Sequence, residues 1–467
     1  MADQTTPTPA ATAVSPPLAA PSSPAVPSSQ RVLLLHAPKQ PYHVTHDYAV
    51  PALVHGRELL VRTRVIGLNP IDWKAPDFNF GLPELPYIAG RELAGDVVLF
   101  DAAGPQEKLR LQSGDRVLAI STDYRDLRKG AYQEYVVAWD YNTVRLPRHV
   151  SYEAGATVGV AFVAAVLALG VNLGVDFSGV EDGPDLLSLV RSLSSSSSST
   201  PLPDDIRDEC LSGIAETDRA RSGDWIAIWG ASSTSAHMAI QLARLAGLRV
   251  AAVVDTAKHG LRLAGHTDLF QSSSSLTPPW QPDLLVDSHD PERAVSILRA
   301  SLGKKLRFGF DTRGRDTATS LLQALACSLG EKKAPTSNPP SPPATPRTSD
   351  AGTTPAIENL SLSSTPSTSL SHLVGLTGLP KGAPPHGGVF HNVPIKLFHE
   401  VPEVGEALSV WLEKLLESGR LIPPVVVGVD TGLESINAGL DRMRAGEISG
   451  GRLVVRLEDG NVDGITA

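Results

Sequence analysis

The sequence predicts an α/β protein with a mostly β domain and a second domain built on a doubly wound parallel sheet. Short apolar runs alternate with Gly, Pro and Asp turns through residues 31–150, a spacing typical of a mainly β domain. Residues 223–258 read as strand, turn, helix and strand, which is the repeating unit of a parallel sheet. At 467 residues the chain is too long for one compact domain.

The N-terminal part begins with a tail. Residues 1–30 are mostly Pro, Ala, Ser and Thr, which bury too little surface to offset chain entropy, so we expect them to be disordered. The strands expected after the tail are Val32–Leu35, Leu59–Ile66, Leu93–Leu99, Arg116–Ile120 and Tyr132–Val137. Residues 151–170 then become helical and rich in small residues.

The segment at 223–258 has the clearest pattern. Trp225–Trp229 is a short apolar run, so we expect a strand buried on both faces. From Ala236 apolar residues follow helical spacing until Gly247, and Leu248–Val254 is a second apolar strand.

The turn before this helix suits a phosphate. The first amides of a helix are unpaired and its dipole is positive there. The turn residues are small and four carry hydroxyls: Gly230, Ala231, Ser232, Ser233, Thr234 and Ser235. The G-x-G-x-x-G/A pattern would fall on Ala231, Ser233 and Ala236, so two glycines are missing. We expect these turn residues to hold a dinucleotide, and the alternative is an ordinary turn of a parallel sheet.

The residues after the second strand leave the choice of cofactor open. Asp255 stands where an acid bonds the ribose diol and repels a 2′-phosphate. Lys258, His259 and Arg262 follow at once and could neutralise that phosphate. We expect NADPH, with NADH as the alternative.

Further strands are expected at Leu284–Asp287, Phe308–Asp311 and Leu373–Leu376. Thr312 and Thr377 follow two of them at the edge where ligands bind, so they could line a nicotinamide or simply cap turns. Two polar segments interrupt this part of the chain. They are 176–222, which includes the serine run 194–199, and 331–370, and composition predicts a linker or loop for both.

The C-terminal part is regular. An apolar stripe at helical spacing precedes Gly419, and Ile436, Leu440 and Met443 form a second one before Gly446. Arg452–Leu457 ends as a strand. We expect these stripes to be core, or a dimer face, rather than a site; the protein would be a monomer or homodimer.

Composition excludes several classes of function. A net charge of −9 gives no electrostatic footprint for nucleic acid. No run of about 18 apolar residues predicts a membrane span, and the N-terminus lacks the basic and apolar regions of a secretory signal. Two cysteines, Cys210 and Cys327, are too few for a disulfide framework or a four-cysteine zinc site. We expect a cytoplasmic protein.

Several segments in combination resemble the medium-chain dehydrogenase/reductase superfamily. They are GLNPIDWK (67–74), PYIAGRELAGDVV (86–98), SGDRV (113–117), GAYQEYVV (130–137), LPRHVSYEAGAT (146–157), GASSTSAHMAIQLARLAG (230–247) and SGGRLVVRL (449–457). The resemblance is nearest to the zinc-independent enoyl reductase and quinone oxidoreductase branch, including fungal trans-enoyl reductases of polyketide clusters.

The resemblance implies the domain layout. A GroES-like catalytic domain would cover 31–153 and 400–467, and a Rossmann cofactor-binding domain would cover 154–399 with both polar insertions. It also implies that no metal is bound. Zinc-dependent relatives carry Cys in the first loop and Gly-His-Glu in the second segment, where this chain has Asn69–Pro70 and Gly90-Arg91-Glu92.

The chemistry left is hydride delivery from a reduced nicotinamide to a conjugated C=C or a quinone. Negative charge develops on the substrate oxygen, and a nearby cation would stabilise it. We expect Lys74 to be that group or the proton donor, with Asn69 and Asp72 holding the loop and the cofactor; the alternative is an Asp72–Lys74 ion pair that only fixes the turn. Residues 78–80 (Phe-Asn-Phe) contain no phenol for a tyrosine relay.

Three functions remain open. The first is an NADPH-dependent reductase of small enones, enoyl thioesters or quinones. The second is a trans-acting enoyl reductase of a polyketide pathway, with a carrier-protein-bound acyl substrate. The third is a non-enzymatic nucleotide-sensing or interaction protein on the same fold.

Overall fold

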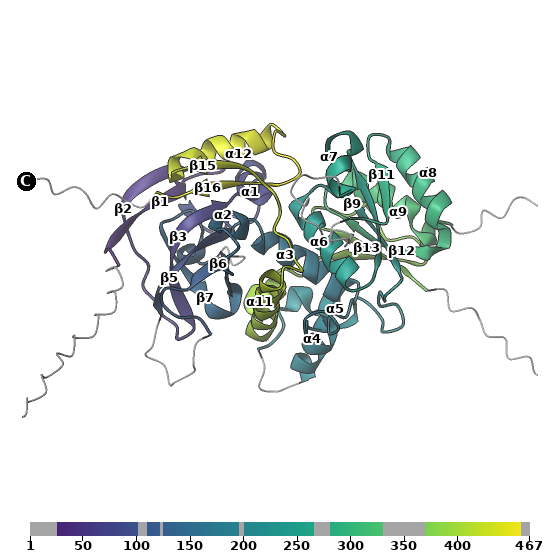
Figure 1. Ribbon diagram of the computed structural model, residues 1–467, viewed down its shortest axis with the longest axis horizontal. Coiled ribbons are helices and arrows are strands. Elements are labelled where there is room, and N and C mark those ends of the chain that lie inside the picture. The colour runs from purple at the N-terminus through teal and green to yellow at the C-terminus, as the bar shows by residue number, and fades with distance from the viewer. Residues whose placement is uncertain are drawn as a thin grey trace, which may run out of the picture.

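The computed structural model describes residues 26–100, 110–121, 125–195, 200–265, 281–329 and 369–458. Figure 1 shows a β-rich half on the left and a half with a helix-covered parallel sheet on the right. The predicted α/β class is confirmed, with a mostly β part and a parallel sheet.

The β-rich half contains two sheets. The larger has the order β15 (Val426–Thr431), β16 (Arg452–Arg456), β3 (Glu58–Gly67), β5 (Glu92–Phe100), β6 (Arg116–Ile120) and β8 (Thr143–Arg145), and β7 (Tyr135–Trp139) also pairs with β3. The smaller has the order β2 (His43–Ala49), β1 (Ser29–Leu35) and β4 (Tyr87–Ile88). Helix α1 (Pro70–Phe78) follows β3 and contacts α12 (Ile436–Arg444).

The other half contains one parallel sheet. Its strand order is β11 (Leu284–Asp287), β10 (Arg249–Val254), β9 (Trp225–Trp229), β12 (Leu306–Asp311), β13 (Ser371–Gly375) and β14 (Gly388–Asn392). Its helices are α6 (Thr234–Leu245), α7 (Thr256–Leu263), α8 (Pro291–Leu302) and α9 (Arg315–Ala324). All five residues of β9 are buried, as its apolar run predicts. Ile226 and Ile228 join the core that contains α6, whereas Ala227 and Trp229 join the core that contains α8 and α9.

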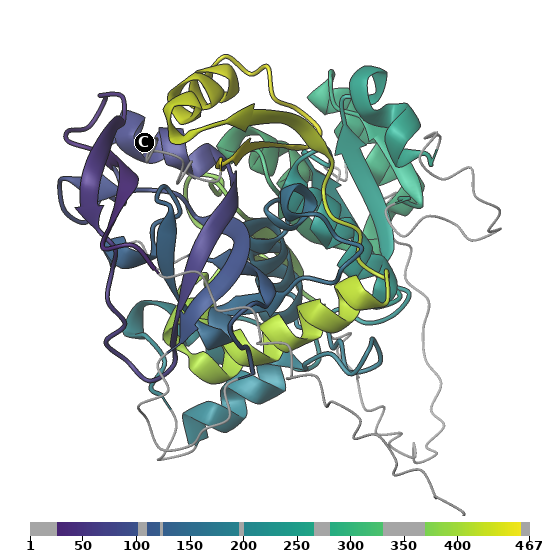
Figure 2. The ribbon, with the colours of Figure 1, turned by 60° about the vertical axis from the view of Figure 1, so that its left-hand side comes forward.

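The helical region after residue 151 joins the two halves. It consists of α2 (Tyr152–Gly155), α3 (Gly159–Leu167) and a π-helical turn (Ala168–Asn172). Figure 1 shows α3 between the two halves, which Figure 2 shows from another side, and its core cluster includes residues of both halves. The boundary between 153 and 154 falls within α2, so the domain division stays a prediction.

The sequence predicts no membrane span, but this helical region is long and apolar. In the described part of the chain, Tyr152–Asn172 is the one helical stretch long and apolar enough to cross a bilayer. Many residues of this stretch are small and apolar, so the sequence shows no long run of bulky apolar residues there. Its most apolar window is 89% buried inside the protein, which is typical of a core helix.

The prediction of a linker or loop at 176–222 is wrong. This segment contains α4 (Leu186–Ser195) and α5 (Asp204–Ser212). Leu187 and Val190 of α4 and Ile206 and Cys210 of α5 point into the main core, so a few apolar residues at helical spacing outweigh the polar composition. Residues 196–199 of the serine run lie outside the described residues, as does nearly all of 331–370.

Near the N-terminus, regular structure begins slightly earlier than predicted. Residues 1–25 lie outside the described residues, but β1 begins at Ser29 and Gln30 is buried, so the predicted tail is slightly too long. The two predicted C-terminal helices are confirmed as α11 (Pro402–Glu417) and α12, and the apolar stripe of α11 is core. Short helix α10 (Lys396–Glu400) precedes them.

Candidate functional site

The turn between β9 and α6 is tight and needs a glycine at its first residue. Gly230 has φ of +79°, and a Cβ there would lie 2.6 Å from Thr312 Oγ1 and 2.5 Å from Arg313 Cγ. Its amide donates to Val253 O at 3.0 Å, and the Ala231 amide donates to the same oxygen at 3.1 Å. The glycine that the turn requires is therefore one residue before the position where the sequence pattern would place it.

The side chains of this turn divide into structural and available groups. Ser233 Oγ accepts from the Ala236 amide at 3.1 Å and donates to Thr312 Oγ1 at 2.9 Å. Thr312 Oγ1 in turn donates to Trp229 O at 3.1 Å, so both hydroxyls tie the turn to β12. In the part of the chain that the structure describes, no hydrogen bond occupies the hydroxyls of Ser232 and Ser235.

Arg452 joins this turn to the β-rich half. Its side chain is 3% exposed, and Nη2 donates to Thr234 Oγ1 at 3.0 Å. Nη1 donates to Leu68 O at 3.0 Å and also to Asn69 Oδ1. One buried guanidinium thus connects the first residue of α6 to the segment that begins α1.

Glu92 completes the same cluster from β5. Its Oε1 accepts from Asn69 Nδ2 at 3.0 Å and lies 3.4 Å from Arg452 Nε, and its Oε2 accepts from the Val160 amide at 2.9 Å. Burial raises the pKa of Glu92, and the Arg452 charge opposes this shift. Neither Arg452 nor Glu92 was predicted as a site residue. The sequence showed only an arginine at the start of an apolar strand and a glutamate in the Gly90-Arg91-Glu92 segment.

Asn69 and Asp72 fix the start of α1, as expected for this loop. The Asn69 amide donates to Asp72 Oδ2 at 2.8 Å, and the Asp72 amide donates to Asn69 O at 3.0 Å. Burial raises the pKa of Asp72 to about 6, and the bond from Asn69 opposes this shift. Contact of either residue with a cofactor stays a prediction.

Two phenols stand beside Asp72, although residues 78–80 supply none. Tyr42 donates to the backbone carbonyl of Asp72 at 2.8 Å, and its ring packs edge-on against Tyr132 with centroids 5.5 Å apart. Burial and the Asp72 charge raise the pKa of Tyr132. These tyrosines come from segments 30 and 60 residues away, so the local loop sequence could not indicate them.

Lys74 is half-buried on α1. Its Nζ lies 5.6 Å from the centre of the Trp73 ring. Across the described residues no ion pair joins Lys74 to Asp72, so the alternative of a turn-fixing pair finds no support. The structure also leaves Lys74 outside the Arg452–Glu92 cluster, and its catalytic role stays a prediction.

A second cluster lies at the ends of β10 and β11. Asp255 caps α7 by accepting from the Lys258 amide at 3.0 Å, which lowers the pKa of Asp255. Lys258 Nζ and His289 Nε2 each lie 3.6 Å from Asp255 Oδ2. A hydrogen bond with Asp287 at 3.1 Å raises the pKa of His289. His289 was not foreseen, although it follows the next strand at the same sheet edge.

Two other predicted residues lie elsewhere. Arg262 donates to Gly450 O, and its neighbour His259 lies 2.9 Å from Ser449 Oγ, so both fasten α7 to the loop before β16. The structure thus does not bring Arg262 to Asp255. Thr377 is exposed in the loop after β13, near Gly314.

Two buried histidines lie on neighbouring strands of the parallel sheet, His372 on β13 and His391 on β14. His391 bonds His372 at 2.9 Å and Glu209 at 2.7 Å. Within the described ranges no group of three or more His, Cys, Asp or Glu residues could hold a metal ion. Zinc independence itself stays a prediction.

Comparison with known sequences supports the resemblance. Residues 55–148 match the alcohol dehydrogenase GroES-like domain. A trans-enoyl reductase of Aspergillus niger is 28% identical over 302 residues, which is 64% of this chain and 68% of that protein. A trans-enoyl reductase of Aspergillus sclerotiorum is 25% identical over 423 residues, which is 89% of this chain and 96% of that protein.

Comparison with solved structures supports the fold. An enoyl reductase named CurK superposes with a TM-score of 0.59 at 13% identity and covers 92% of this chain and 99% of its own. A mycobacterial protein crystallised with NADPH superposes with a TM-score of 0.59 at 16% identity over 91% of this chain and 99% of its own. Taken with the matched GroES-like domain and the sheets of the two halves, these likenesses support the resemblance to the medium-chain dehydrogenase/reductase superfamily of oxidoreductases, in its enoyl reductase and quinone oxidoreductase branch.

Proposed function

We propose that this protein is a zinc-independent, NADPH-dependent reductase that delivers hydride to the C=C of an enone or enoyl thioester, or to a quinone. The observation that carries the proposal is the Arg452 cluster. It holds the first residue of α6, beside the hydroxyl-rich turn, against the segment that begins α1. The turn that would bind the nucleotide and the segment that would carry the active site are thus fixed next to each other.

The turn fits a dinucleotide. Its side chains are small, the Ser232 and Ser235 hydroxyls have no partner among the described residues, and the helix dipole of α6 is positive at this end. We assign the pyrophosphate to Gly230–Ser235 and the adenosine ribose to Asp255. When bound, the reduced nicotinamide would supply the hydride.

The surroundings of Asp255 favour NADPH over NADH. An isolated acid there would repel a 2′-phosphate. Here Lys258 and His289 flank the carboxylate at 3.6 Å, and the bond with Asp287 favours the protonated imidazole. These two cations would compensate the acid and bind the phosphate.

Lys74 is the group that we assign to the substrate. As hydride arrives, negative charge grows on the carbonyl oxygen, and an ammonium aimed at that oxygen lowers the barrier. No carboxylate among the described residues neutralises Lys74, so its charge remains available to the substrate. Its Nζ also holds a proton that the product requires.

A trans-acting enoyl reductase of a polyketide pathway is the second candidate. The observation that favours it is the near full-length similarity to a fungal trans-enoyl reductase. A small-molecule quinone reductase would need no surface for a carrier protein, so the two differ in whether carrier-bound thioesters are preferred.

The test follows oxidation of NADPH by its absorbance across enones, quinones and acyl thioesters. We expect turnover by the parent and a loss of about 10²–10³-fold in kcat for Lys74→Ala. NADPH binding, measured separately by fluorescence titration, should survive this change. Lys304→Ala is the matched control, because Lys304 is an exposed lysine in the turn before β12. Equal kcat for Lys74→Ala and the parent would reject the assigned role, and no turnover on any substrate would reject the function.

A further inference from the structure

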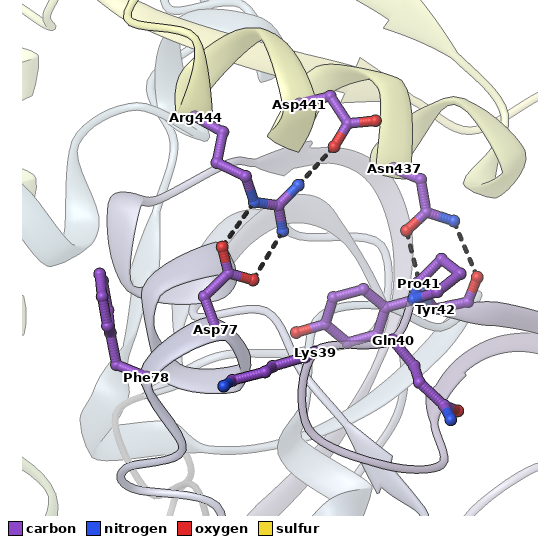
Figure 3. Close-up of a pocket in the computed structure, with 9 residues that line it drawn as sticks. All are labelled: Lys39, Gln40, Pro41, Tyr42, Asp77, Phe78, Asn437, Asp441 and Arg444. Carbon is purple, nitrogen blue, oxygen red and sulfur yellow. Dashed lines mark hydrogen bonds and ion pairs between the residues drawn. The ribbon is translucent and has the colours of Figure 1, made fainter.

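A pocket of about 620 Å³ lies at the C-terminal end of α1. Figure 3 shows its walls, formed by α1, by α12 and by the loop between β1 and β2. Asn437 of α12 holds that loop in place, because its Oδ1 accepts from the Tyr42 amide at 3.0 Å and its Nδ2 donates to Tyr42 O at 2.7 Å. The pocket is therefore a fixed feature of three elements rather than a gap beside a single loop.

The two cations of this pocket differ in their partners. Arg444 donates to both carboxylate oxygens of Asp77, at 2.7 and 3.0 Å, and also to Asp441, so its charge is neutralised. Lys39 forms no ion pair with any described residue. Figure 3 shows its side chain extending across the pocket toward the side where Phe78 stands. The pocket thus offers one free ammonium.

The backbone holds Lys39 in this position. Its φ is +62°, in the left-handed region that a lysine rarely adopts, and its amide donates to Pro76 O of α1 at 3.2 Å. The strained turn is fastened to the same helix that forms the opposite wall. This arrangement fixes the free cation relative to α1.

The apolar side of the pocket leads toward Lys74. Phe78 is 67% exposed, and its ring lies 6.2 Å from that of Trp73. Lys74 and Phe78 are four residues apart, so they share one face of α1 and lie about 6 Å apart along its axis. A ligand on this face would meet an ammonium at the reacting end, then an aromatic surface, then a second ammonium.

We propose that this pocket binds the phosphorylated pantetheine arm of an acyl thioester, with the phosphate at Lys39 and the arm against Phe78. The proposal rests on the proposed function. Among the substrates of that function, it selects the acyl thioesters. Simple enones and quinones have no anionic group at a distance from the reacting carbon, whereas a pantetheine thioester carries its phosphate at the far end of an elongated arm. The same phosphate occurs in coenzyme A and on carrier proteins.

The first experiment compares crotonyl thioesters of phosphopantetheine and of unphosphorylated pantetheine. In the parent we expect a KM about two- to fivefold lower for the phosphorylated substrate, the size of one exposed ion pair, with equal kcat. Lys39→Glu should abolish the difference, and Phe78→Ala should raise both KM values. Lys304→Glu, which changes an exposed lysine far from the pocket, should leave the difference intact. Equal KM values in the parent would overturn the proposal.

The second experiment separates this proposal from the function on which it depends. Phosphopantetheine alone is titrated into the parent and Lys39→Glu proteins by calorimetry. Binding that Lys39→Glu weakens supports the pocket even if no thioester is reduced, in which case the thioester function fails. Absence of binding together with reduction of thioesters refutes the pocket alone. A lower KM for carrier-bound crotonate than for crotonyl coenzyme A would identify a carrier protein as the source of the arm, and the reverse order would identify coenzyme A.

Discussion

Replacement of Arg452 by Met tests how the two halves are held together. The change removes hydrogen bonds to Leu68 O, Asn69 Oδ1 and Thr234 Oγ1 and keeps a side chain of similar length. It also leaves Glu92, which is fully buried, without its cation. Removal of one partner of a buried ion pair costs about 3–5 kcal/mol of unfolding free energy. We expect a loss of that size for Arg452→Met.

The assay is urea unfolding followed by tryptophan fluorescence, with the m-value checked for constancy. Most of the loss should come from the stranded carboxylate, so the added change Glu92→Gln should restore part of the stability. The coupling between the two substitutions should be about 0.5–3 kcal/mol. The loss should also shrink as pH falls, because burial raises the pKa of Glu92 and protonation neutralises its carboxylate.

Two results would refute this reasoning. One is a loss below about 1 kcal/mol, which would mean that water or a rearrangement satisfies Glu92. The other is a double variant no more stable than Arg452→Met alone, which would mean that the hydrogen bonds to α1 and α6, and not the buried charge, carry the effect.

Three further predictions concern the turn, the α1 segment and the ribose site. Gly230→Ala should lower the unfolding free energy by at least about 1–3 kcal/mol, because φ is +79° and a Cβ would clash with Thr312 and Arg313; thermal unfolding checks this, and an unchanged Tm would contradict it. Burial raises the pKa of Asp72 from 3.8 to about 6, so the protonated carboxyl contributes to the free energy of unfolding below pH 4, and about 3 kcal/mol of that contribution is lost as pH rises to 6. Asp72→Asn should flatten that part of the stability–pH curve, and an unaltered curve would count against the burial of the carboxylate. The double change Lys258→Ala and His289→Ala should raise the Kd of NADPH about tenfold and leave that of NADH unchanged, as measured by fluorescence titration; equal effects on both cofactors would place the 2′-phosphate elsewhere.

Local sequence pattern was sufficient for five of the six strands of the parallel sheet, and β14 was not predicted. The apolar run of β9, the helical spacing of α6 and the small residues between them are all short-range signals, and the structure has each of them. The same reasoning failed at 176–222, where serine-rich composition outweighed the apolar spacing of α4 and α5. Composition averages over a segment, whereas burial needs only one face of a helix.

The site was harder to predict, because its strongest contacts are between residues far apart in the chain. Asn69 and Arg452 are 383 residues apart, and nothing near either of them indicates the other. His289 likewise becomes a neighbour of Asp255 only because β10 and β11 are adjacent. The residues predicted from local motifs, Asn69, Asp72 and the turn at 230–235, are indeed placed at the junction, but their partners required the folded chain.

The position of β16 has a consequence for synthesis on the ribosome. This strand pairs with Val65–Gly67 of β3 on one side and with β15 on the other, yet it is made long after β3. Until residue 456 leaves the exit tunnel, the nascent chain carries an unpaired edge of β3, and Glu92 lacks its partner Arg452. A stop codon placed just before this strand should therefore yield an aggregating product rather than a shortened enzyme.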